Sequence, residues 1–198
     1  MEKLKGVRIL KPATEILTLE QCREHIRRDD TDDDSKIKLL LSAVVARLDG
    51  VDGILGRALI TQTWQDEMDA FPVSDRLPLS LCPVQSVISI QYYDIDGNLQ
   101  TMAASDYAAH NRTNFAHIKL AENASWPETD DRDDAVKVTY VAGYGDAADD
   151  VPATIRHAAL LLLGEWYELR EEVVTETIAT RLPDGVMTLL RPYIRPHF

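Results

Sequence analysis

Apolar positions recur at helical spacing in two separate parts of the chain. Residues 37–55 place an apolar side chain every three or four positions, and residues 155–169 do so again after Val151-Pro152. A shorter helix is predicted from Thr18, because Thr18 and Gln21 form a capping-box pattern. The two long stripes are too wide to remain in water, so we expect these helices to pack together.

The long stripes also predict which residues form the core. Stripes of this kind are typical of a core or a helix contact rather than of a cofactor site. Gly56 is the expected end of the second helix, since glycine commonly follows a helix C-terminus. A further short helix is expected at 183–190. Five positions are expected in the core or in a contact between subunits: Leu41, Val45, Leu48, Leu162 and Trp166.

Between these helical segments the apolar period changes to two, which is typical of strands. Ile88, Ile90 and Tyr92 are expected to share one buried face, and Asp96-Gly97 is a hairpin turn signal. The pattern predicts a small antiparallel sheet or barrel. Strands are expected at 59–70, 85–93, 99–102, 106–110, 116–120 and 135–141.

The order of these segments predicts an α+β fold, in which a helical core carries an inserted small antiparallel β domain. Residues 1–17 have no clear period and are expected to form an extended N-terminal arm. The last eight residues are expected to be an extended tail, because Pro192 and Pro196 exclude regular helix. The expected parts are the arm at 1–17, the helical core at 18–57 and 151–190, the β-rich insert at 58–150, and the tail at 191–198.

Charge limits what the protein is expected to bind. The 198 residues carry a formal net charge of -12, and the pI is about 4.8. Residues 1–11 are net +3 and residues 181–198 are net +2, which leaves -17 for the chain between them. A body with this charge repels nucleic-acid phosphates and anionic membranes, whereas the basic ends can meet an acidic protein surface.

No residue spacing predicts a metal, cofactor or catalytic site. Cys22 and Cys82 lack the spacing of a zinc site or a disulfide scaffold. The histidines at 25, 110, 117, 157 and 197 form no metal-ligand pattern. No apolar run reaches the ~18 residues of a membrane span, and no signal peptide is present. We therefore expect a soluble protein of a reducing compartment.

Two segments imitate known motifs only in part. Residues 143–148 fit the glycine pattern of a dinucleotide site, but Asp146, Asp149 and Asp150 would repel pyrophosphate, and no crossover helix precedes them. Residues 94–98 resemble the start of a calcium loop, but its sixth and twelfth positions hold Leu99 and Ser105 instead of Gly and Glu. We interpret these segments as a strand-to-helix turn and a hairpin turn.

Six short segments, in this order and at this spacing, resemble the head-to-tail connector, or adaptor, proteins of long-tailed bacteriophages and prophages. The resemblance spans most of residues 17–193. The segments are Leu-Thr-Leu-Glu at 17–20, Gly-Arg-Ala-Leu-Ile-Thr-Gln-Thr-Trp at 56–64, Leu-Cys-Pro-Val-Gln-Ser-Val at 81–87, Val-Thr-Tyr-Val-Ala-Gly-Tyr-Gly at 138–145, Val-Pro at 151–152 and Trp-Tyr-Glu-Leu-Arg-Glu at 166–171.

The resemblance implies a structural protein of the virion neck, present in the host cytoplasm during assembly. Its helical connector core would assemble into a ring of twelve subunits beneath the portal protein. The ring would extend the DNA channel, let DNA pass without specific binding, and support the next neck or tail-completion protein. It implies no enzymatic activity, no cofactor, no metal and no membrane. The alternatives are a small intracellular enzyme of unknown reaction and a DNA-packaging accessory factor.

The C-terminal tail is the expected portal-docking segment. Arg191 and Arg195 supply cations, while Tyr193, Ile194 and Phe198 supply apolar anchors on a chain that its prolines hold extended. Extended-segment recognition needs anchors at such intervals. The alternative is a frayed chain end without function.

Overall fold

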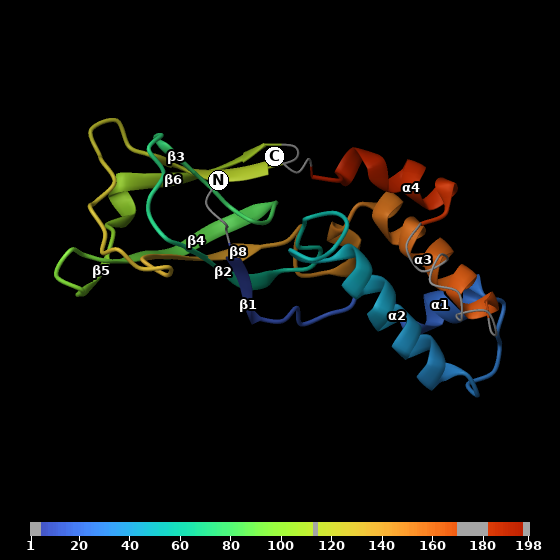
Figure 1. Ribbon diagram of the computed structural model, residues 1–198. Helices are drawn as coiled ribbons and strands as arrows, with labels where there is room; N and C mark the ends of the chain where they lie inside the picture. Colours follow the sequence, from blue (N-terminus) through green and yellow to red (C-terminus); the bar gives the residue numbers. More distant parts are fainter. Residues whose placement is uncertain (1–4, 113–114, 170–181, 196–198) are drawn as a thin grey trace.

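The computed structural model describes residues 5–112, 115–169 and 182–195. Its helices gather at one end of an elongated molecule and its strands at the other (Figure 1). The helices are α1 Leu19–His25, α2 Asp34–Leu48, α3 Ala153–Glu168 and α4 Asp184–Leu190, with 3-10 turns η1 Ala104–Asp106, η2 Ala148–Asp150 and η3 Arg191–Tyr193. The strands are β1 Lys5–Leu10, β2 Gln62–Met68, β3 Arg76–Pro78, β4 Val84–Tyr93, β5 Leu99–Thr101, β6 Tyr107–Arg112, β7 Phe115–Leu120 and β8 Val136–Ala142. The predicted α+β class is confirmed.

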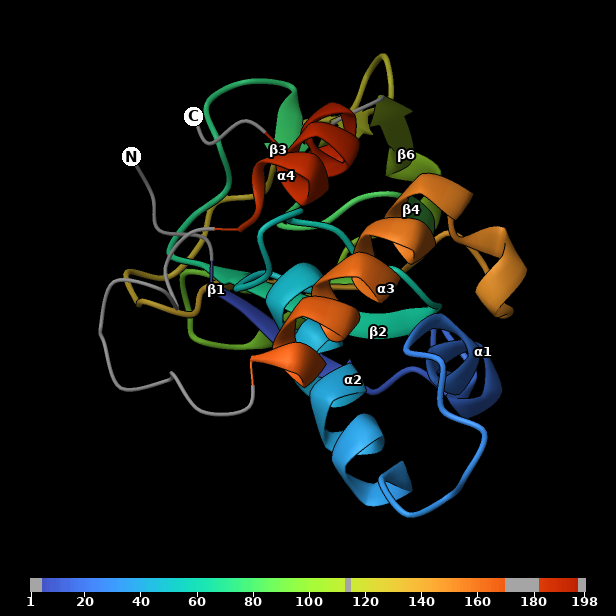
Figure 2. The same ribbon diagram turned by 90° about the vertical axis from the view of Figure 1, so that its right-hand side faces the viewer.

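The helices share one apolar cluster, which we call the helical lobe. α3 lies between α2 and α4 and packs against both, so the predicted packing of the two long helices is confirmed (Figure 2). The capping box is also confirmed, because the Gln21 N–H donates to Thr18 Oγ1 at 3.1 Å and the Thr18 N–H donates to Gln21 Oε1 at 2.9 Å. These caps and stripes position the helices as the sequence predicts.

The five expected core residues all belong to the helical cluster, but two of them are only half-buried. Leu41, Leu48 and Leu162 are buried, whereas Val45 and Trp166 pack against the cluster from its edge. The fully buried residue at this point of α2 is Val44, which precedes Val45. A helix turns 100° per residue, so adjacent positions cannot both face the centre of the core.

Helix α2 ends at Leu48, and the expectation that it continues to Gly56 is wrong. Asp49 leaves the helix in an extended conformation with φ -93° and ψ 144°. Its side chain accepts hydrogen bonds from the Leu59 N–H at 2.8 Å and from Gln62 Nε2 at 2.9 Å, which holds the turn in place. Leu55 still reaches the helical cluster, so the apolar pattern continues through a turn instead of a helix.

The strands form two sheets that share a second apolar cluster, which we call the β lobe. The larger sheet has the order β1-β2-β8-β4-β5 and the smaller has the order β3-β7-β6. All of their strand pairs are antiparallel. Residues of both sheets, including Trp64, Leu77, Ile118 and Tyr140, pack in this cluster, so the lobe is a small two-layer sandwich.

The described part of the predicted N-terminal arm, residues 5–17, is not a separate extended segment. Lys5–Leu10 is β1, an edge strand of the larger sheet that pairs with β2 from Lys5↔Glu67 to Leu10↔Thr63. This strand was not predicted, because an edge strand with a register shift has no clean alternation of apolar and polar residues. The β lobe therefore includes chain from before the helical lobe.

Ile88 does not share the buried face of Ile90. The register of β4 against β8 shifts between Val87 and Ser89, and Ile88 is 58% exposed. A bulge of this kind places an extra residue in one strand and turns its side chain away from the regular alternation. The prediction that Ile88 lies on the buried face of this strand is therefore wrong.

Candidate docking site at the C-terminal segment

The described C-terminal segment, residues 191–195, crosses the junction between the two lobes. The Arg195 N–H donates to the Leu55 carbonyl at 3.1 Å, and Arg57 Nε donates to the Tyr193 carbonyl at 2.6 Å. The Arg195 guanidinium donates to the carbonyl of Ser80. The segment therefore holds the turn after α2 and the strand region together.

Arg57 and Gly56 form the surface against which this segment lies. Arg57 is buried and forms parallel bridges with Asp49 and Cys82, so its own backbone joins the two lobes. Gly56 has φ +60°, and a Cβ there would lie 3.1 Å from the Cβ of Arg195. A side chain at Gly56 would therefore be strained and would also press on the C-terminal segment.

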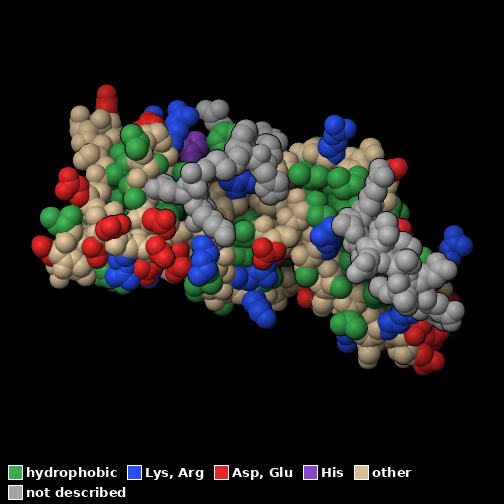
Figure 3. All heavy atoms as spheres, viewed as in Figure 1, with side chains coloured by type: hydrophobic (Ala, Val, Ile, Leu, Met, Phe, Trp, Pro, Cys, Tyr) green, Lys and Arg blue, Asp and Glu red, His purple; other side chains and the backbone are tan. Residues whose placement is uncertain are grey.

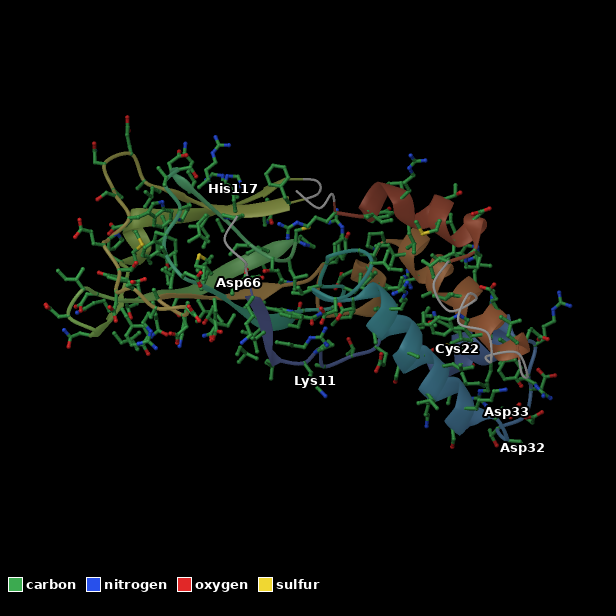
Figure 4. All side chains as sticks on the ribbon, viewed as in Figure 1. Lys11, Cys22, Asp32, Asp33, Asp66 and His117 are labelled. Carbon is green, nitrogen blue, oxygen red and sulfur yellow. The ribbon has the colours of Figure 1, made fainter. Side chains whose placement is uncertain are left out.

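Asp66 is a buried carboxylate beside this junction. Its side chain is 0% exposed and accepts from the Ser80 N–H at 2.7 Å and from the Tyr140 hydroxyl at 3.2 Å. Burial raises the pKa of Asp66 to about 6, although these hydrogen bonds and the charge of Arg195 act to lower it. Figure 4 shows Asp66 in the β lobe near its helical end.

A second buried carboxylate connects β1 to the same junction. Asp49 Oδ2 lies 2.6 Å from Arg8 Nη2, and the Arg8 guanidinium lies 4.9 Å from the centroid of a Trp64 ring. Burial raises the pKa of Asp49, while the Leu59 N–H and Arg8 oppose that shift. β1, the turn after α2, and β2 are thus joined by one polar network.

A groove runs beside the C-terminal segment. It has a volume of about 670 Å³ and is lined by Arg57, Val84, Gln85, Tyr144, Pro192 and Tyr193, among others. Its wall combines one buried cation with aromatic and backbone groups. It offers anchoring to another protein chain, but no arrangement of a nucleophile and a base lines it.

The structure brings four of the five expected portal-docking residues together at this junction. Arg191 is exposed, Arg195 is half-buried, and Tyr193 and Ile194 pack against the helical cluster. Residues 191–193 form a 3-10 turn rather than an extended chain. Phe198 lies outside the described residues. The partners of Tyr193 and Arg195 were missed by sequence reasoning, because they are more than 110 positions away and no local pattern encodes them.

The rest of the described chain offers little chemistry. Within the described ranges, no three His, Cys, Asp or Glu side chains gather in a way that could hold a metal ion. Cys22 and Cys82 are free and buried, and burial raises the pKa of Cys22 to about 11, which disfavours the reactive thiolate. No helix in these ranges combines the length and the apolar character that crossing a bilayer requires.

Comparison with known proteins identifies the family. The sequence model of the head completion protein family matches residues 15–195, which include both lobes and the C-terminal segment up to Arg195. This chain belongs to the head completion protein family. The family is structural, and a head completion protein is a head-to-tail connector in the neck of a phage-like virion. The match begins after β1, so that strand lies outside the family pattern.

Solved structures show the same fold for this head completion protein. A chain in the virion of the native gene transfer agent (GTA) particle is 22% identical with a TM-score of 0.77, covering 98% of this chain and 96% of that one. A chain in the neck of the empty GTA particle, computed with C6 symmetry, is 22% identical with a TM-score of 0.74 and covers 96% and 97%. A chain in the neck of the native particle, computed with C12 symmetry, gives 0.67 at the same identity and coverage. No curated protein matches the chain.

Proposed function

We propose that this head completion protein forms a ring of twelve subunits beneath the portal protein and extends the DNA channel of the particle. The family match over residues 15–195 is the observation that carries the proposal. The C12 symmetry of the native GTA neck, which contains a chain of this fold, supports the number of subunits. The outer surface of the ring would support the next neck or tail-completion protein.

We further propose that the C-terminal segment contributes to portal docking. Hydrogen bonds from Arg57 and from the Arg195 N–H hold residues 193–195 on the body, which fixes where the last three residues begin. Arg191 is exposed on the same segment. An exposed cation at a fixed exit point suits an acidic groove of the portal.

The proposed ring takes no part in catalysis and lets DNA pass without specific binding. The net charge of -12 supplies few cations that could release the counterions of DNA, so the channel wall would not retain it. Figure 3 shows Asp and Glu side chains gathered at both ends of the molecule in that view.

The proposal is tested by attachment to portal-bearing heads of the same particle. We expect wild-type protein to co-sediment with heads that have a portal and not with heads that lack one. Removing residues 196–198 together with Arg191→Ala should greatly weaken attachment and leave the melting temperature unchanged, because the contacts of Tyr193 and Arg195 are kept.

The matched control is Arg76→Ala, which removes another exposed arginine, on β3 of the β lobe and not on the C-terminal segment. This variant should attach at the wild-type level. Failure of the wild-type protein to attach would contradict the portal-binding function. Full attachment of the truncated Arg191 variant would contradict only the docking role of the segment.

A further inference from the structure

One face of α2 is left uncovered by the rest of the described chain. The buried residues of α2 are Ile37, Leu41, Val44 and Leu48, which pack against the neighbouring helices. Leu39 points to the opposite side and is 70% exposed. Its neighbours on that side are exposed and small, namely Ser42, Ala43 and Ala46, with exposed Lys38 beside them. Leu39 is thus the one large apolar side chain on this exposed face of α2.

A groove that could receive an apolar side chain lies between α1 and α3, on a different side of the helical lobe. It has a volume of about 440 Å³, and Leu17, Gln21 and Leu160 line it together with His25 and His157. A smaller hollow of about 280 Å³ adjoins it at His25. Figure 2 shows α1 and α3 side by side at the end of the helical lobe. Of the two leucines that line this groove, Leu160 is half-buried and Leu17 is only 3% exposed, so Leu160 presents most of the leucine surface.

The charges around the groove also complement α2. Glu24 lines the larger hollow and Glu168 the smaller one, and both are exposed. Arg156, which also lines the groove, has its charge offset by Asp149 at 2.7 Å. Burial, and to a lesser extent His157, lowers the pKa of His25, so this imidazole is neutral near pH 7. The smaller hollow is also lined by one cation, Arg27, which is exposed.

We propose that Leu39 on α2 of one subunit inserts into the groove between α1 and α3 of the next subunit, and that this contact repeats around the ring. The inference rests on the ring proposed above. A ring needs two different surfaces on each subunit, because a contact between identical surfaces closes as a dimer. The α2 face and the α1/α3 groove are two such surfaces, since the exposed side of α2 points away from both α1 and α3.

The contact also addresses the repulsion between acidic subunits. Each chain carries a net charge of -12, so twelve neighbours repel one another at low salt. In the proposed contact, Leu39 meets Leu17 and Leu160, while Lys38 approaches the carboxylates of Glu24 and Glu168. Burial of the leucine and pairing of unlike charges both favour association, and the charge pairing also orients the subunits.

Cysteine cross-linking tests the contact in assembled particles. In a chain carrying both Leu39→Cys and Gln21→Cys, oxidation on portal-bearing heads should produce a ladder of covalent oligomers. The same chain in dilute solution should give no ladder, and neither should the wild type, because Cys22 and Cys82 are buried. The control pairs Gln21→Cys with Ile95→Cys, which is 66% exposed at the far end of the β lobe, and should give no ladder.

A charge substitution provides a second readout. Leu39→Glu should reduce the occupancy of portal-bearing heads about tenfold at limiting protein, because a carboxylate cannot enter an apolar groove without loss of hydration. Ile95→Glu should bind like the wild type. Both variants should melt like the wild type, since both side chains are mostly exposed.

The outcomes separate this inference from the proposed function. If the wild type attaches to heads, but Leu39→Glu attaches equally well and the double cysteine variant gives no ladder, the inference is wrong and the ring uses other surfaces. If the wild type itself does not attach, the proposed function fails and the inference fails with it.

Discussion

At the scale of single residues, the junction between the lobes depends on buried polar side chains that satisfy one another. Asp49, Arg57 and Asp66 are all buried, and each forms hydrogen bonds to backbone or side-chain groups from distant parts of the chain. A buried carboxylate without such partners would strongly destabilise the fold. These residues therefore fix how the turn after α2 and the C-terminal segment meet the β lobe.

The raised pKa of Asp66 makes stability depend on pH in a definite direction. Its pKa is about 6 in the folded protein and 3.8 without the environment of the fold, so the folded state binds the proton more tightly between these values. The contribution of Asp66 to the free energy of unfolding is fully present below about pH 4, and it is lost as the pH rises through 6. We expect Asp66→Asn to gain roughly 2 to 3 kcal/mol in unfolding free energy relative to wild type between pH 4 and pH 7.

Denaturant unfolding at a series of pH values measures this difference, and Asp94→Asn provides the control. The pKa of Asp94 is lowered by hydrogen bonds from Gln100 and Asn98, so its stability contribution is lost as the pH falls. That loss lies below the ordinary pKa of 3.8, so Asp94→Asn should leave the pH dependence of stability between pH 4 and 7 unchanged, whereas Asp66→Asn should remove most of it. A constant difference between Asp66→Asn and wild type from pH 4 to 7 would show that Asp66 stays ionised in the fold.

At the scale of elements, local patterns predicted most of the structure and long-range contacts decided the rest. The expected strands at 85–93, 116–120 and 135–141 agree with β4, β7 and β8 to within one residue, because their alternation is regular. α2 ends early because Asp49 is held by Leu59 and Gln62, and β3 was missed because three residues carry no period. The early end of α2 thus reflects tertiary contacts that override the local preference, and the missed β3 reflects a strand too short to show a pattern.

The position of β1 leads to a prediction about this strand. Removing residues 1–10 deletes Arg8, leaves the buried Asp49 carboxylate without its cation, and exposes the edge of β2. We expect a loss of roughly 3 kcal/mol in unfolding free energy and increased self-association, because a free strand edge pairs with other chains. Thermal unfolding and sedimentation measure these two effects.

Removing residues 1–4 alone is the matched control, because β1 and Arg8 are kept. This shorter deletion should behave like the wild type. Equal stability of the two deletions would mean that β1 contributes nothing to the fold.

At the scale of the whole molecule, the sequence was more informative about the protein's function than about which residues lie together on its surface. The joint order of segments from 17 to 171 predicted the connector family, which the family match confirms. The contacts of the C-terminal segment were harder to predict, because Tyr193 and Arg195 are held by residues more than 110 positions away. Leu39 did carry a signal, since it is a large apolar residue that falls outside the stripe of α2.

Native mass measurement, of the protein alone and with its portal, tests the central claim most directly. In dilute, low-salt solution we expect mostly monomer, because subunits with a net charge of -12 repel one another. With the portal present, we expect one sharp species whose mass equals the portal ring plus twelve copies of this 22.2 kDa chain. A mixture in which the portal keeps its own mass and the chain stays monomeric would contradict the account.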